Sequence, residues 1–110
     1  MALTSNSSGA QIATLATEHT LATIITGGTY VLSVDLGALA NGETLTLRVK
    51  SKVRAADTSR TVYESSFQHA QGAPNKYSPA IPVIAEGVFT LMQSGGTGRT
   101  FPWNILQLDG

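Results

Sequence analysis

The sequence predicts an all-β fold: a single antiparallel β-sandwich or jelly-roll-like barrel with a flexible N-terminal arm. Short runs in which apolar and polar residues alternate recur along the chain, and glycine, asparagine or proline separates these runs. No run has the length and period of a convincing long helix. Because 110 residues are the usual size of one domain, we expect the arm over residues 1–9 and the sandwich over residues 10–110.

The expected arm is polar. Residues 4–9 are serine, threonine, asparagine and glycine, with no apolar side chain among them. Fixing the backbone of one residue costs roughly 1–2 kcal/mol, and this segment has no apolar surface to offset that loss. We therefore expect the arm to become ordered only against a partner.

The first half of the domain is expected to contain strands. Residues 11–25 are rich in threonine and isoleucine, which favours a strand, and a short helix over residues 13–21 is the alternative. Two glycines at 27–28 signal a turn. Residues 29–36 then alternate as a half-buried strand does. Its apolar side chains share one face: Tyr30, Leu32, Val34 and Leu36.

The clearest strand spans residues 43–54, directly after the turn signal Asn41-Gly42. Four apolar residues are expected to face the core: Leu45, Leu47, Val49 and Val53. The polar and basic residues between them are expected to face outward. Residues 60–70 resume the alternation, and we expect them to pair with this strand as a hairpin.

The second half is expected to begin with a long loop over residues 71–82, because three prolines there interrupt the supply of backbone donors. Residues 83–94 and 100–108 predict two more strands, joined by the glycine-rich turn at 95–98 into a closing hairpin. The second of these strands carries three large apolar residues on one expected core face: Phe101, Trp103 and Ile105.

Composition excludes several classes of function. The net charge is zero, so no overall field attracts nucleic acid or an anionic membrane. The absence of cysteine excludes disulfide frameworks, zinc ribbons and a thiol nucleophile. No apolar run approaches the roughly 18 residues of a membrane span, and the N-terminus does not resemble a signal peptide, so we expect a protein assembled in the cytoplasm.

Motifs for catalysis are also missing from the sequence. His19 and His69 belong to no HExxH or comparable cluster, no G-x-S-x-G occurs, and the seven acidic residues are dispersed. Residues 95–99 lack the lysine and the following helix of a phosphate-binding loop. We therefore predict no catalytic, cofactor-binding or metal-binding residues, and a protein that is not an enzyme.

The strongest charge asymmetry is a basic row that holds five of the seven cationic residues. One interpretation is a solvated strand face that discourages aggregation. Another is a docking surface for an acidic protein partner. Packaged nucleic acid is the least favoured partner. The candidate protein-contact residues are Arg48, Lys50, Lys52, Arg54 and Arg60.

Two stretches of the chain resemble small virion proteins encoded among the head and tail genes of tailed bacteriophages: GGTYVLSVDLGALANGETLTLRVKSKV at 27–53 and FTLMQSGGTGRTFPWNILQL at 89–108. The shared patterns are G-T-Y-x-L-x-V-D, G-[ED]-x-L-x-L-R-x-K and L-x-Q-x-x-G-x-x-R-x-F-x-W. The resemblance implies a structural role in the virion as a capsid decoration or cement protein. It further implies contacts with the major capsid protein. The low charge and small core predict a homo-oligomer, and the resemblance favours a trimer because decoration proteins often occupy threefold positions.

Other functions remain open at this point. A tail, neck or fibre-associated component of the particle is the alternative to a capsid decoration protein. A soluble carbohydrate- or receptor-binding β-module is a further alternative, and it would require aromatic side chains exposed as stacking platforms. A small β-fold enzyme would require a catalytic cluster, which the sequence does not display.

Overall fold

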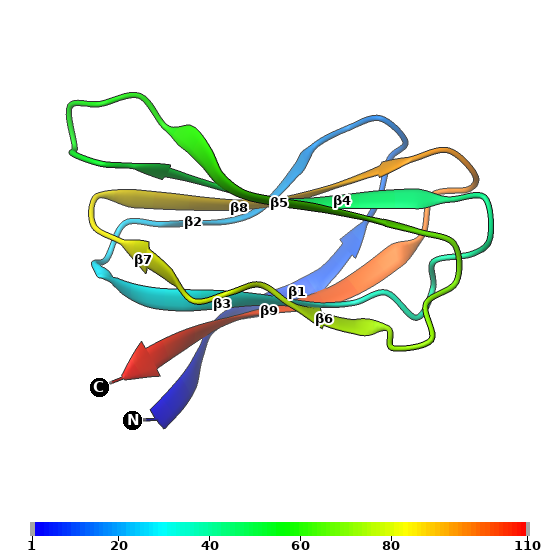
Figure 1. Ribbon diagram of the computed structural model, residues 1–110, viewed down its shortest axis with the longest axis horizontal. Helices are drawn as coiled ribbons and strands as arrows, with labels where there is room; N and C mark the ends of the chain where they lie inside the picture. The colour runs from blue at the N-terminus through cyan, green and yellow to red at the C-terminus, as the bar shows by residue number, and fades with distance from the viewer. Residues whose placement is uncertain (1, 110) are drawn as a thin grey trace.

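The computed structural model describes residues 2–109, which form nine strands and no helix. The strands build two antiparallel sheets packed face to face, and the N- and C-terminal ends lie together at one corner (Figure 1). This confirms the predicted all-β sandwich. The strands are β1 (Ala2–Ile12), β2 (His19–Ile24), β3 (Gly28–Asp35), β4 (Thr44–Lys52), β5 (Arg60–Gln68), β6 (Asn75–Tyr77), β7 (Ile81–Val83), β8 (Glu86–Ser94) and β9 (Thr100–Asp109).

The two sheets differ in strand order. The five-stranded sheet has the order β1-β9-β3-β6, with β7 also paired to β3. The four-stranded sheet has the order β2-β8-β4-β5. Strands that are neighbours in the sheets are therefore mostly distant in the sequence, as in other antiparallel sandwiches.

The core lies between the sheets and is built by alternation along the strands. Every second residue of β3, β4, β8 and β9 points inward, and large side chains such as Tyr30, Phe89 and Phe101 are fully buried. The Tyr30 and Phe89 rings meet edge to face at 6.5 Å across the two sheets. Burying one such side chain contributes roughly 1.5–3 kcal/mol, so this interior holds the sheets together.

Several predicted strands are confirmed. β3, β4 and β5 occupy the expected positions, and β4 pairs with β5 as the predicted hairpin, with Leu45 opposite Phe67. One core residue was misplaced: Val53 is 81% exposed, because β4 ends at Lys52 before the alternation reaches it. The strand expected over residues 11–25 is interrupted between Ile12 and His19. The alternative, a helix over residues 13–21, does not form, because residues 13–18 are irregular and β2 begins at His19.

The N-terminal segment corrects the flexible arm expected for residues 1–9. Residues 2–9 belong to β1, which pairs with β9 from Ala2 opposite Asp109 to Ile12 opposite Thr100, and Met1 lies outside the described residues. The arm was expected to be flexible because it has no apolar side chains to bury. Its backbone is instead ordered by hydrogen bonds to β9. The Trp103 ring lies over Gly9, so close that a Cβ there would be 3.3 Å from its Cζ2 atom.

The expected closing hairpin is also corrected. β8 pairs with β2 and β4, whereas β9 pairs with β1 and β3, so residues 95–99 cross from one sheet to the other. Trp103 remains partly buried against the core. The long loop expected over residues 71–82 contains β6 and begins β7, whose short lengths agree with the prolines around them.

Candidate functional site

The predicted basic row lies on the outer face of the four-stranded sheet, and acidic side chains of the same chain pair with it. Arg48 donates hydrogen bonds to Glu64 Oε1 at 2.6 Å and to Glu18 Oε2 at 3.0 Å. Lys50 donates to Glu18 Oε1 at 3.1 Å. Lys52 lies 4.0 Å from Glu86. Strand pairing thus gathers acids that are dispersed in the sequence.

Glu18 is the centre of this network. The Thr90 hydroxyl donates to Glu18 Oε2 at 2.7 Å, in addition to the two cations. Burial alone would raise the pKa of Glu18, but the hydrogen bonds from Thr90, Lys50 and Arg48 together hold this pKa below its ordinary value. The carboxylate therefore stays ionised, and it neutralises the middle of the row.

The remaining two candidates lie near the end of the row. Arg54 donates twice to Asp57, at 2.9 and 3.0 Å. Arg60 is exposed, and among the acidic side chains that the structure describes none lies within 4.0 Å of it. Four of the five candidate residues thus have partners inside the chain, and their role in docking a second protein stays a prediction.

A second polar cluster surrounds Glu43, which is only 3% exposed. Its carboxylate accepts hydrogen bonds from the amides of Ala40 and Thr97 and from the Arg99 guanidinium, at 2.9 to 3.1 Å. The bond from Arg99 is the main reason why the pKa of Glu43 falls to about 2. Thr97 and Arg99 belong to residues 95–99, whereas Ala40 belongs to the turn before β4, so the Glu43 carboxylate ties these two segments together.

The histidines serve turns as well. His19 Nε2 accepts a hydrogen bond from the Thr14 amide, and His69 Nδ1 accepts one from the Gly42 amide, both at 2.9 Å. Among the described residues, no three histidine, cysteine or acidic side chains form a group that could hold a metal ion. The same residues include no helix that is both long and apolar enough to cross a membrane.

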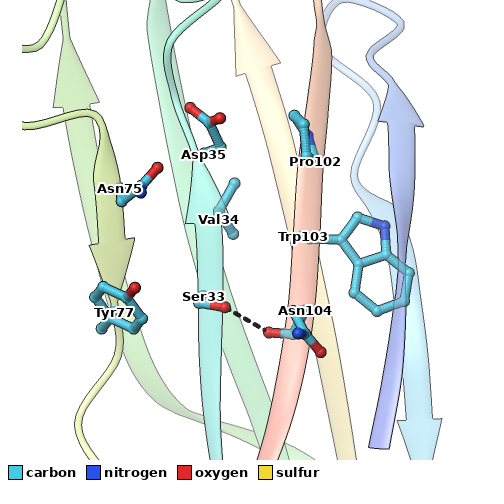
Figure 2. Close-up of a pocket in the computed structure, with 8 residues that line it drawn as sticks. All are labelled: Ser33, Val34, Asp35, Asn75, Tyr77, Pro102, Trp103 and Asn104. Atoms are coloured by element: carbon cyan, nitrogen blue, oxygen red, sulfur yellow. Dashed lines mark hydrogen bonds between the residues drawn. The ribbon is translucent and has the colours of Figure 1, made fainter. Parts of the chain in front are cut away.

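A groove of about 260 Å³ lies on the outer face of the five-stranded sheet, over β3, β6 and β9 (Figure 2). Its lining includes the last two pairs of the ladder between β3 and β9, Ser33–Asn104 and Val34–Trp103. The next residue outward on β9 is Pro102, which has no amide hydrogen to continue the ladder. Asp35 on β3 and Pro102 on β9 lie at the upper end of the residues that line the groove (Figure 2).

Polar side chains and one aromatic ring surround this groove. Asp35 Oδ1 accepts from the Gly37 amide at 2.8 Å, and Asn104 Oδ1 accepts from the Ser5 hydroxyl at 2.7 Å. Tyr77 is 63% exposed, and among the side chains that the structure describes neither its hydroxyl nor the Asn75 side-chain amide has a protein partner. An exposed ring beside amide and carboxylate groups can stack on and hydrogen-bond a sugar or a peptide. Sequence reasoning missed this site because Tyr77 lies in the segment expected to be a loop.

A second, apolar groove of about 270 Å³ lies beside β5 and β7. Three of its residues are unusually exposed for aliphatic side chains: Val53 at 81%, Val62 at 55% and Ile84 at 75%. We call these three residues the aliphatic patch. The alternation of polar and apolar residues gave no signal for it, because Val53 and Ile84 follow the ends of strands and Val62 lies at a bulge.

Comparison with protein families, with curated proteins and with solved structures gave no match for this chain. The site is therefore interpreted from its own geometry. Two surfaces could bind a partner: the aliphatic patch and the groove beside Tyr77.

Proposed function

We propose that this chain is a structural, non-catalytic subunit of a tailed-bacteriophage particle, a decoration or cement protein that stabilises the head by contacts with the major capsid protein. The observation that supports this most is the aliphatic patch, on a chain with only 13% charged residues. Monomeric proteins tolerate few clustered aliphatic side chains in water, and such clusters commonly mark protein contacts. The resemblance of residues 27–53 and 89–108 to small virion proteins is the reason for proposing a phage particle as the partner assembly.

The surrounding charges favour apolar contact over an electrostatic one. Lys52, the one cation in the lining of this groove, lies 4.0 Å from Glu86. Arg54, which follows Val53 in the chain, is paired with Asp57. A partner surface that covers Val53, Val62 and Ile84 would remove apolar area from water, at about 25 cal/mol for each Å² buried. Under this proposal the complex tolerates salt, because few unpaired charges take part.

The experiment compares two neighbouring positions on β5. Val62→Asp places a charge in the patch, whereas Thr61→Asp places the same charge on the adjacent exposed residue outside the groove lining. We expect the parent protein at stoichiometric copy number in purified particles, strong loss of incorporation for Val62→Asp, and incorporation close to the parent for Thr61→Asp. Melting temperatures of both variants should stay near that of the parent, since both residues are exposed.

Two results would contradict this proposal. Purified particles that lack the chain would remove the virion role. Incorporation of Val62→Asp at the level of the parent would place the capsid contact on another surface.

A second function is favoured by the groove beside Tyr77, namely carbohydrate binding. The ring is 63% exposed and stands beside Asn75, Asp35 and Asn104, which carry donors and acceptors for sugar hydroxyls. A screen of soluble oligosaccharides by chemical-shift perturbation tests it, with Tyr77→Ala as the variant. Shifts confined to the groove and lost in Tyr77→Ala would favour this function, whereas an absence of shifts across the screen would oppose it.

A further inference from the structure

The free edge of β1 differs from the other sheet edges of this molecule. β1 lies at one end of the five-stranded sheet and pairs with β9 alone among the described strands. It spans eleven residues and contains no charged residue and no proline. An edge strand exposes a row of unpaired amide and carbonyl groups, and natural proteins usually protect it by shortness, charge or proline.

The other edges show that protection. β5 carries Arg60 and Glu64. β2 is six residues long, and β6 and β7 have three residues each. The contrast singles out β1 as the edge that is long, uncharged and without proline.

The side chains of β1 are arranged to match a second copy. Leu3 and Ile12 lie near opposite ends of the strand and are 62% and 69% exposed. Leu3 pairs with Leu108 and Ile12 pairs with Thr100, and these two β9 residues lie an even number of residues apart, so Leu3 and Ile12 point to the same face. It is the outer face, because the alternate β9 residues Phe101 and Ile105 are buried. When two copies of β1 run antiparallel about a twofold axis, Leu3 of one copy meets Ile12 of the other at both ends.

We propose that two copies of this protein pair through β1, antiparallel, so that the two five-stranded sheets become one continuous sheet. In this register Leu3 faces Ile12 of the copy and Ser5 faces Ala10. The irregularity between Ser5 and Ser7 then falls next to the twofold axis, and the regular stretches 3–5 and 10–12 pair with each other. Identical uncharged strands meet without like-charge repulsion, and a twofold contact is the commonest form of self-association. The inference rests on β1 alone and holds whether or not the protein belongs to a phage.

A charge exchange at the two ends of β1 tests the register. Leu3→Lys and Ile12→Glu each place a charge against an aliphatic side chain of the copy, so each should raise the dimer dissociation constant by at least about tenfold. The double variant Leu3→Lys/Ile12→Glu places the two opposite charges together and should recover most of that loss. Within one chain these positions are about 30 Å apart along the strand, which is beyond electrostatic reach, so recovery reports a contact between copies.

The control applies the same charges to the other long edge: Ser66→Lys and Gln68→Glu on β5, both at exposed positions. Sedimentation equilibrium up to about 1 mM protein covers weak association. Circular dichroism melting verifies that each variant is folded. The control variants should associate like the parent.

A cysteine pair gives an independent readout, because the chain contains no cysteine. A mixture of Ser5→Cys and Ala10→Cys proteins should form a mixed disulfide on mild oxidation faster than either variant alone, since paired strands bring the Cβ atoms close. A parent that stays monomeric throughout the concentration range overturns the proposal. Single variants without effect, a double variant without recovery, or equal cross-linking in all mixtures also overturn it.

Discussion

The two sheets share one core and differ on their outer faces. On the four-stranded sheet, Arg48, Lys50 and Lys52 are paired with acids of the same chain. On the outer face of the five-stranded sheet, Asp35 is the one charged side chain among those that the structure describes. The first face has satisfied its own charges, and the aliphatic patch lies beside its edge strand β5. The second face and its β1 edge keep apolar side chains, amides and backbone groups available for contact.

The largest expected effect tests the common core. Phe89 belongs to the four-stranded sheet and Phe101 to the five-stranded sheet, and both are fully buried. Phe89→Ala and Phe101→Ala should each lower the free energy of unfolding by roughly 3–5 kcal/mol, through lost burial and the cavity left behind. Urea unfolding measures this loss of free energy for each variant. A loss below about 1 kcal/mol for either variant would mean that the two sheets do not share the interior equally.

The next prediction concerns the crossing between the sheets. The pKa of Glu43 is about 2 in the folded protein and near 4.5 in an ordinary glutamate. A folded pKa below the unfolded one stabilises the fold above about pH 4.5, and this stabilisation is lost as the pH falls toward 2. Thermal unfolding between pH 6 and pH 2 should therefore be less pH-dependent in Glu43→Gln than in the parent, and the variant should be less stable at neutral pH.

Glu64→Gln is the matched control, because the Glu64 side chain is 52% exposed and holds only Arg48. It should leave most of the acid dependence in place. An identical pH profile for Glu43→Gln and the parent would contradict the assigned role of Glu43 in fixing residues 95–99.

The sandwich could be predicted from the sequence where side chains decide the structure. In β3, β4 and β5 the alternation of apolar and polar residues fixed the buried face, and the hairpin between β4 and β5 followed from their proximity in the chain. β1 could not be found this way, because its order depends on backbone bonds to β9, about a hundred residues away in sequence. A polar strand whose partner is distant in the sequence looks like a flexible arm.

The candidate surfaces were harder to predict for the same reason. The basic row was visible in the sequence, but its neutralisation required Glu18, Glu64 and Glu86 from three other segments.

The hairpin between β8 and β9 was expected because glycines at 95 and 96 suit a turn, and both do have positive φ angles. The next residue, Thr97, donates its amide to Glu43 and accepts at its carbonyl from the Gln93 side chain, and these contacts hold the segment as a crossing between sheets. Turn chemistry reports local conformation and not the sheet that the next strand joins.

A smaller effect is expected from the ion pairs of the four-stranded sheet. Glu18→Gln removes the carboxylate that Arg48, Lys50 and Thr90 share, and it should lower stability by about 1 kcal/mol at low salt, since surface pairs contribute roughly 0.2–1 kcal/mol each. The difference should shrink at about 1 M NaCl, where the screening length is near 3 Å. Asp57→Asn, which affects only the pair with the exposed Arg54, should change stability by less. Salt-independent loss in Glu18→Gln would mean that packing and not charge accounts for this carboxylate.

The smallest effect on stability is expected on the outer face of the five-stranded sheet. Tyr77 is 63% exposed, and its ring takes no part in the core between the sheets. Tyr77→Ala should therefore change the free energy of unfolding by less than about 0.5 kcal/mol, the usual range for a surface substitution. Tyr30→Ala is the contrasting variant, because Tyr30 is fully buried and donates to the Thr26 carbonyl, so its loss should resemble that of Phe89→Ala. If Tyr77→Ala proved as destabilising as Tyr30→Ala, the outer face would be part of the folding core, and the contrast between a self-satisfied face and an available one would no longer hold.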